Sequence, residues 1–476
     1  MDSIINDTRA EVTLQRYATP TPGRFPIMAV TNSNTRDKGR TSIETLRILK
    51  NAGFSFIRES IVKADYPVPR TEEELIDDVL TDGQTVGIRL LIKPGGSSHF
   101  SSTDYSTYAY QRNRWISIAK RFFNRASLAG WFLVDEPNEI RDSANNLTTP
   151  SLDTIFSRLE ETKNEIVKVD PWQHIVCVNL PTFRSFEYRI NDVVYPNSFL
   201  TDLTWFKGFR SYVRKYIQIF GPAVLTSSTY GFGSSLTGIQ HQYGYFQNFE
   251  LLKRLSYMIQ RPFWGYFRCC YRWDKGGFIQ KDQNGLEVDN GKKVLARYRS
   301  DVFCALAFGA QGICGWETTS HEESPKKEQI FYSPIDENGE VTVLMTYLTE
   351  VLSQVRRVEH IFLHGTVREC RFSATSDASK YFKSGAEAYP FGPLKTIYAQ
   401  STNTPGFLIS LIENRDKTYM AFININMSNA ESMRLIFDHG MKRVPVKPED
   451  QETIISKGET FYLSLDSGEM AIFEVR

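Results

Sequence analysis

The chain of 476 residues is long enough for two or three domains, and its hydrophobic content of 41% is enough for ordinary packed cores. Lysine and arginine number 56 against 55 for aspartate and glutamate, so the net charge of +1 gives no whole-chain reason to expect nucleic acid or an acidic membrane as a partner. No run of roughly 18 apolar residues exists that would span a membrane.

Residues 1–24 are predicted to be an N-terminal extension ahead of the first strand. They begin MDSIINDTRAEV, without the basic and apolar regions of a secretory signal. This start predicts the cytosol, unless the chain is a mature or trimmed form, for which a periplasmic or extracellular location stays open.

From residue 25 onward, short apolar runs alternate with amphipathic helical segments. Apolar residues in the helical segments recur at spacings of three and four, as Ile43, Leu46 and Leu49 do. Helices are predicted at 41–53, 71–87, 110–126, 151–169, 202–221, 245–261, 297–310 and 345–362, and several end at glycines that suit left-handed caps, namely Gly53, Gly87 and Gly221. The strand candidates are 25–33, 54–60, 88–96, 128–137, 174–182, 222–230, 262–270 and 311–319.

Eight such strand and helix units predict a (β/α)8 TIM barrel over residues 25–362, a catalytic-type domain of the α/β class. An open doubly wound sheet is disfavoured, since no GxGxxG motif follows a strand. A long polar segment at about 275–296 interrupts the pattern between the seventh strand and its helix. It is interpreted either as a lid over a cleft or as a plain exposed loop.

Residues 363–476 change to a period of two, which is typical of strands with one buried face. The alternating runs are 407–413, 418–427, 433–438, 459–466 and 469–476, separated by turn clusters such as ENRDK and DSGE. They predict a small antiparallel β-sandwich domain at the C-terminus.

The six cysteines show neither paired CxxC spacing nor the density of a disulfide scaffold. They are predicted to be mostly buried free thiols. The run His321, Glu322, Glu323 is interpreted as a solvated turn, because adjacent side chains diverge in an extended loop. No metal and no organic cofactor is expected.

Polar residues at the carboxyl ends of barrel strands face the catalytic mouth of a TIM barrel. Besides two glutamates, the residues at or just after the predicted strand ends that are expected to contact a substrate are Glu59, Lys93, Asp135, Asn138, Asn179, Tyr230, Arg268, Trp273 and Trp316. Trp273 and Trp316 are candidates for stacking on sugar rings, whereas Trp131 and Trp264 are better explained as core.

Glu136 and Glu317 have the most apolar approaches of the strand-end carboxylates, in GWFLVDE and GICGWE. Apolar surroundings raise the proton affinity of a carboxyl, as a general acid requires. Two carboxylates around an aromatic-lined cleft are the usual equipment for cleaving a glycosidic bond.

Four stretches carry a family resemblance: ASLAGWFLVDEPNEIRD, VDPWQHIVCVNLPT, RPFWGYFRC and SDVFCALAFGAQGICGWETT. Together they resemble the (β/α)8 glycoside hydrolases related to β-galactosidases, in which DEP or NEP follows the fourth strand. The resemblance covers most of residues 25–362, and the closing SKGETFYLSLDSGEMAIFEV is similar to the terminal β-sandwich of that family. It implies that Glu136 is the general acid/base.

The chain departs from this family at strands six and seven. Members usually carry a nucleophilic glutamate after strand seven, where this chain has Arg268 in FRCCYRW, and only Tyr230 remains recognisable after strand six. The second carboxylate is therefore Glu317, Glu59 or Asp135, or catalysis has been lost. We favour Glu317, because strands four and eight lie on opposite walls of a barrel.

Other roles for these charged residues stay open at this point. Glu136 is alternatively a structural carboxylate paired with Arg58 or Arg268. Asp135 alternates to the other side of its strand from Glu136, which predicts an orienting role. Arg268 and Lys93 either recognise a carboxylate on an acidic sugar or neutralise the glutamates.

The sequence therefore predicts a glycoside hydrolase acting on an oligosaccharide or polysaccharide fragment, with its oligomeric state open. The alternative is a non-catalytic glycan-binding protein on a degenerate hydrolase barrel. A barrel enzyme of unrelated chemistry would be favoured by a phosphate site after strands seven and eight, and no Gly-rich pattern there indicates one.

Overall fold

The structure is a computed structural model of the chain. It describes residues 24–31, 40–61, 70–95, 97–138, 148–181, 203–231, 245–273, 279–281, 287–289, 291–319, 330–336, 338–373, 392–399, 406–427 and 429–476. The N-terminal extension and the run His321 to Glu323 that the sequence analysis singled out thus lie almost wholly or wholly outside the described residues.

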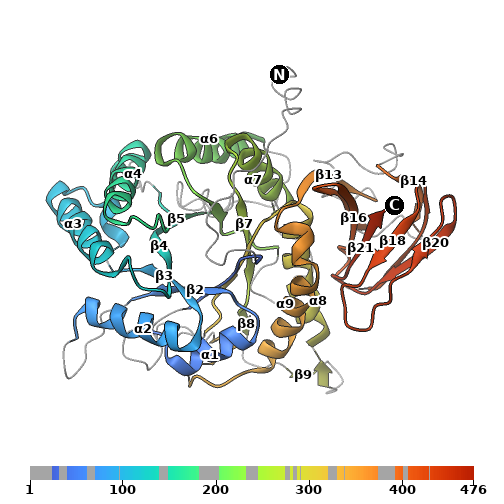
Figure 1. Ribbon diagram of the computed structural model, residues 1–476, viewed down its shortest axis with the longest axis horizontal. Helices are drawn as coiled ribbons and strands as arrows, with labels where there is room; N and C mark the ends of the chain where they lie inside the picture. The colour runs from blue at the N-terminus through green and yellow to red at the C-terminus, as the bar shows by residue number, and fades with distance from the viewer. Residues whose placement is uncertain are drawn as a thin grey trace.

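A closed barrel of parallel strands forms the larger part of the molecule, ringed by helices (Figure 1). Its strands follow the ring order β1-β11-β7-β6-β5-β4-β3-β2. Each strand lies within a range predicted from the sequence, which confirms the TIM barrel. The strands are β1 (Ile27–Val30), β2 (Phe56–Ser60), β3 (Arg89–Lys93), β4 (Leu128–Asp135), β5 (Ile175–Leu180), β6 (Leu225–Ser227), β7 (Phe263–Arg268) and β11 (Ile313–Trp316).

The helices alternate with these strands as the apolar periodicity predicts. Thr71 and Glu74 form a capping box at the start of α2, and Gly87 closes that helix in the left-handed conformation. Gly53 and Gly221 also have positive φ, so the predicted glycine caps are confirmed. The helices are α1 (Ile43–Asn51), α2 (Glu72–Val86), α3 (Tyr105–Phe122), α4 (Leu152–Val169), α6 (Leu203–Phe220), α7 (Tyr245–Ile259), α8 (Gly291–Ala307) and α9 (Val343–Phe362).

Side chains alternate between the barrel interior and the layer under the helices. Phe56 on β2 belongs to an interior cluster that also contains Phe132 and Tyr266, whereas Ile57 packs outward into the large core shared with the helices. Trp131 and Trp264 are both buried, as predicted for core residues. This alternation decides which strand-end side chains reach the mouth.

The polar segment after β7 is more structured than a plain loop. Short strands β9 (Ile279–Lys281) and β10 (Glu287–Asp289) pair antiparallel within it, and α8 begins at Gly291, earlier than the predicted start at 297. Just before it, β8 (Tyr271–Trp273) pairs with β12 (Ile330–Tyr332). The segments that follow β7 and β11 are therefore joined to each other on the carboxyl side of the barrel.

The C-terminal residues form two antiparallel sheets, which confirms the predicted β-sandwich. One sheet has the order β13-β15-β16-β21-β18-β19 and the other β14-β17-β20. The sandwich lies beside α8 and α9 (Figure 1). Its strands are β13 (Thr366–Phe372), β14 (Leu394–Ala399), β15 (Phe407–Asn414), β16 (Lys417–Asn424), β17 (Glu431–Phe437), β18 (Met441–Val444), β19 (Ile454–Ile455), β20 (Thr460–Leu465) and β21 (Met470–Val475).

All six cysteines are free thiols, and every one except the half-buried Cys370 is buried. This agrees with the prediction of buried thiols. Among the described helices, none combines the length and the apolar character needed to cross a membrane.

Candidate active site

The two glutamates singled out by the sequence stand on opposite walls of the barrel. Glu136 follows β4 and Glu317 follows β11. In the ring order, β7, β6 and β5 separate these strands on one side, and β3, β2 and β1 separate them on the other. The prediction that strands four and eight face each other is confirmed.

Both glutamates have a left-handed backbone. The φ angle is 48° at Glu136 and 55° at Glu317, values that non-glycine residues rarely adopt. Such a conformation costs of order 1–3 kcal/mol and is concentrated at functional sites, where the surrounding structure holds it in place. Each strand therefore ends in a turn that redirects a carboxylate.

The turn at Glu136 is held by neighbouring elements. The Glu136 N–H donates to the carbonyl of Asn179 on β5 at 2.8 Å. The Tyr212 hydroxyl, from α6, donates to the carbonyl of Pro137 at 2.5 Å. The Glu136 side chain is half-buried. Burial raises the pKa of Tyr230 on the adjoining wall, and the negative charge of Glu136 adds to that rise. The carboxyl thus has a fixed backbone and access to solvent.

Asp135 does not lie behind the strand, contrary to the prediction from simple alternation. The register between β4 and β5 shifts between Phe132 and Asp135, which is the signature of a β-bulge. The bulge changes the phase of alternation, so Asp135 faces the barrel interior, on the same side as Phe132. Both acids of the DEP segment therefore stand at the mouth.

Arg58 on β2 pairs with Asp135 rather than with Glu136. Its Nη1 lies 2.8 Å from Oδ2 of Asp135, and its guanidinium stacks 4.6 Å from the Phe132 ring centre. Asn179 donates to the other Asp135 oxygen at 2.8 Å. Burial alone would raise the pKa of Asp135, but Arg58, Lys93 and Asn179 outweigh it and hold that pKa below its usual value. Asp135 is thus an ionised anchor at this end of the barrel.

Lys93 ends β3 beside this pair. Its ammonium lies 5.8 Å from the Phe132 ring centre and is half-buried. Burial and the nearby positive charge of Arg58 lower the pKa of Lys93 to about 8, against a smaller opposing effect from Asp135.

Arg268, Tyr230 and Trp316 form what we call the Arg268 cluster. The guanidinium carbon of Arg268 lies 5.0 Å from the ring centres of both Tyr230 and Trp316. Those rings are 5.4 Å apart with an interplanar angle of 41°. Cation–π contacts of this kind hold an arginine in place without consuming its hydrogen-bond donors. The cluster joins the ends of β6, β7 and β11 on one wall.

Asp301 on α8 supports this wall and was not identified from the sequence. Its carboxylate accepts the N–H of Gly231 at 2.9 Å and also a backbone hydrogen bond from Arg268, so it fixes the chain beside two members of the Arg268 cluster. Burial raises the pKa of Asp301 to about 7, although these hydrogen bonds oppose the rise. The sequence does contain a signal for Asp301, because it is an acid at helical spacing between the apolar residues Tyr298 and Ala305.

Glu317 is more enclosed than Glu136, with only 4% of the residue exposed. The Cys270 thiol donates to its Oε2 at 2.7 Å. A donor to a carboxylate favours its charged form. Glu317 is thus positioned by the segment that follows β7.

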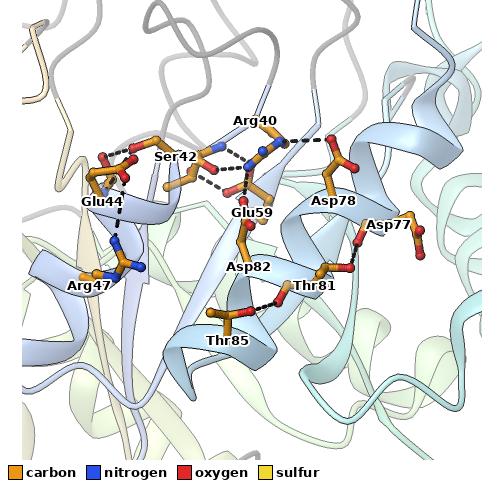
Figure 2. A network of polar contacts seen from close by, with 12 residues as sticks. Arg40, Ser42, Glu44, Arg47, Glu59, Asp77, Asp78, Thr81, Asp82 and Thr85 are labelled. Carbon is orange, nitrogen blue, oxygen red and sulfur yellow. Dashed lines mark hydrogen bonds and ion pairs between the residues drawn. The ribbon is translucent and has the colours of Figure 1, made fainter.

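Glu59 is enclosed away from the mouth, and this position gives no support to its expected role as a substrate ligand. It points outward from β2, is fully buried, and accepts hydrogen bonds from the Thr41 N–H at 2.8 Å and the Thr41 hydroxyl at 2.5 Å. The Thr31 hydroxyl adds a third at 3.1 Å. Figure 2 shows Glu59 in this network near the start of α1. Its alternation relative to the inward Arg58 explains why it cannot serve as the second carboxylate.

The structure gives less information on Asn138 and Trp273, two further residues expected to bind substrate. Asn138 is 4% exposed, and neither of its side-chain polar atoms has a partner among the described residues. Trp273 lies in β8, which places its backbone in the segment after β7, while its side chain lies outside the described part. Within the described residues, no group of three or more His, Cys, Asp or Glu side chains is arranged to hold a metal ion.

Comparisons with solved structures find the same fold in two glycoside hydrolases. A family 39 glycoside hydrolase from the gut symbiont Bacteroides cellulosilyticus WH2 matches with a TM-score of 0.52 and 12% identity, over 95% of this chain and 81% of that one. An α-amylase from Geobacillus thermoleovorans, complexed with acarbose, matches with a TM-score of 0.52 and 10% identity, over 95% of this chain and 98% of that one. No protein-family model and no curated protein sequence matches the chain. The structural neighbours are glycoside hydrolases, and the chain shares their fold.

Proposed function

We propose that the protein is a glycoside hydrolase in which Glu136 is the general acid/base. The observation that carries this proposal is Glu136 itself: a half-buried carboxyl at the end of β4, held in a left-handed turn that faces the barrel mouth. The fold shared with two glycoside hydrolases supports the same class of reaction.

In the proposed mechanism, Glu136 protonates the glycosidic oxygen as the bond to the leaving group breaks. The sugar carbon then acquires positive charge, which a second carboxylate on the far wall stabilises or attacks. Glu317 is our candidate for that carboxylate, since it stands opposite Glu136. Asp135 is the remaining alternative, because it also faces the mouth, but Arg58 and Asn179 already occupy its oxygens.

We also propose the finer relationship and the domain division that the sequence suggested. The DEP segment after β4 supports membership of the β-galactosidase-like clan. The end of α9 at Phe362 and the start of β13 at Thr366 support a catalytic domain over 25–362 and a β-sandwich domain over 363–476.

A non-catalytic glycan-binding protein is the second candidate. The observation in its favour is Arg268 at the end of β7, together with the small exposed fraction of Glu317. Binding of a sugar by the Arg268 cluster requires no second carboxylate.

A screen of aryl glycosides and oligosaccharides with the wild-type chain and Glu136→Gln separates these candidates. We expect the wild type to release product from at least one substrate. Glu136→Gln should lower that turnover by about 10²- to 10⁴-fold with little change in the melting temperature, since the amide has nearly the size of the carboxyl but cannot act as a general acid or base. Glycan binding by both proteins without turnover by either would support the second candidate instead.

A further inference from the structure

Lys93 and Arg268 are two cations at the barrel mouth, and neither forms an ion pair with a carboxylate of the described residues. Lys93 ends β3 and Arg268 ends β7. In the ring order, β4, β5 and β6 separate these strands on one side, and β2, β1 and β11 separate them on the other. Both side chains are half-buried, so both reach solvent at the mouth.

Neither cation forms an ion pair with a carboxylate of the described residues. Asp135, the acid that acts on Lys93, already pairs with Arg58 at 2.8 Å and accepts from Asn179 at 2.8 Å. Neutralisation of the DEP aspartate is thus performed by Arg58. Lys93 lies beside that pair as an additional positive charge.

The Arg268 guanidinium lies against two ring faces, and Asp301 on α8 accepts the backbone N–H of Arg268 and acts on its charge. The contacts to Tyr230 and Trp316 at 5.0 Å hold the guanidinium through its face, and a contact of this kind takes up none of the N–H donors. Its Nε is enclosed and has no partner among the described residues. An arginine in this state presents donors that suit an incoming carboxylate or sulfate.

The Lys93 side agrees with this interpretation. Burial, and after it repulsion by the neighbouring Arg58, lower the pKa of Lys93. A bound anion would relieve this repulsion. Lys93 and Arg268, which form no ion pair within the described part of the chain, therefore complement a negative ligand better than the uncharged rings of a neutral glycan.

We propose that the mouth selects glycans carrying an anionic substituent, a carboxylate or a sulfate, with Arg268 binding that group and Lys93 favouring it from the opposite wall. This inference rests on the proposed carbohydrate site and names the class of sugar that the site takes. Arg268 and Lys93 are then specificity-determining residues.

Binding measured with Glu136→Gln, which should not consume the ligand, tests the proposal. The probes are acidic oligosaccharides paired with uncharged counterparts of the same backbone: uronate oligosaccharides with their carboxyl-reduced or methyl-esterified forms, and sulfated oligosaccharides with their desulfated forms. We expect an acidic member to bind about tenfold or more tightly than its counterpart, because charge-assisted hydrogen bonds are lost in the neutral form. The carboxylate and sulfate pairs distinguish the two sources of negative charge.

Substitutions locate the preference. Arg268→Met and Lys93→Met, each in the Glu136→Gln background, should lower the preference for the acidic member, and Arg268→Lys should retain part of it. Arg121→Met on α3 and Lys168→Met on α4 remove exposed cations outside the mouth and should leave the preference unchanged. If Arg268→Met does not fold, Lys93→Met and Arg268→Lys still decide the outcome.

Equal or tighter binding of the neutral members would overturn this inference while leaving the proposed carbohydrate site intact. A preference for acidic sugars that survives both Arg268→Met and Lys93→Met would also overturn it. Absence of binding and turnover with every glycan would instead overturn the proposed function, and this inference with it.

Discussion

Asp135 and Glu136 are adjacent carboxylates that meet different surroundings at the same mouth. Asp135 is ionised and bonded to Arg58 and Asn179, whereas Glu136 lies beyond the strand in a left-handed turn. A general acid must be able to hold a proton near neutral pH, and a carboxylate already paired with an arginine holds one poorly. The difference in surroundings supports the proposal that Glu136 transfers the proton and that Asp135 is an anchor.

Glu59 lies on the other face of β2 and is a further carboxylate whose role depends on its surroundings. Glu59→Ala removes the acceptor for Thr41 and Thr31, so we expect the free energy of unfolding to fall by about 1–3 kcal/mol, the cost of leaving buried donors unpaired. The KM for any substrate found should not change. Urea denaturation and steady-state kinetics measure the two quantities.

Glu44→Ala on α1 is the control for this substitution, since Glu44 is an exposed acid of the same region with 70% of its side chain accessible. It should change the free energy of unfolding by less than about 0.5 kcal/mol. A raised KM for Glu59→Ala at unchanged stability would mean that Glu59 binds substrate after all.

Only those site residues that stand at the ends of barrel strands could be predicted from the sequence. Glu136, Lys93, Arg268 and Trp316 were found because each follows an apolar run. The inward position of Asp135 was missed, since a bulge has no periodic signal and shifts every later side chain. The left-handed turn at Glu136 was missed as well, because glutamate has no preference for it.

At the scale of elements, the apolar runs were sufficient to predict all the barrel strands. Buried parallel strands read as short continuous hydrophobic segments, which set them apart from the helices between them. The strands β9 and β10 were not predicted, because short pairs in a polar insertion carry no such signal. Strand β13 was missed because its burial pattern does not alternate, and β18 and β19 were missed because they are brief. Strand β14, LKTIYA, was missed because its apolar residues do not alternate with polar ones.

Gly130 in β4 allows a close approach to β5. A Cβ at this position would lie 2.2 Å from the carbonyl oxygen of Ile175, which is backbone and cannot move aside easily. Gly130→Ala should therefore lower the free energy of unfolding by about 1–3 kcal/mol, as overpacked substitutions do. Chemical denaturation measures it.

Gly440→Ala provides the matched control in the sandwich. Its added Cβ would meet no atom closer than 3.8 Å, so its free energy of unfolding should stay within about 1 kcal/mol of the wild-type value. Equal stability of Gly130→Ala and Gly440→Ala would contradict the close packing of β4 against β5.

At the scale of the whole molecule, the barrel and one side of the sandwich share a hydrophobic cluster, and the sandwich also encloses a core of its own. Leu408 and Ile472 of the sandwich belong to the same buried cluster as the residues of α8 and α9. Polar contacts reinforce the junction: the Ser410 hydroxyl donates to the Ala307 carbonyl at 2.7 Å, and Arg299 on α8 lies 3.0 Å from Glu469. The sequence predicted the two domains but had no signal for the cluster that they share.

We therefore expect the barrel and the sandwich to unfold together. Arg299→Met removes the ion pair to Glu469 and should lower the unfolding midpoint of both parts equally. All seven tryptophans lie in the barrel segment, so their fluorescence follows the barrel, while hydrogen exchange of β16 and β21 follows the sandwich. Two separate midpoints would show that the domains are independent.

The central claim is that Glu136 donates the proton to the departing oxygen, and a series of aryl glycosides with leaving groups of different acidity tests it most directly. A good leaving group needs no proton, whereas a poor one does. We predict that Glu136→Gln retains most of the wild-type rate of bond cleavage on a dinitrophenyl glycoside and loses about 10²-fold or more on the corresponding phenyl or alkyl glycoside. An equal loss across the whole series would contradict the claim.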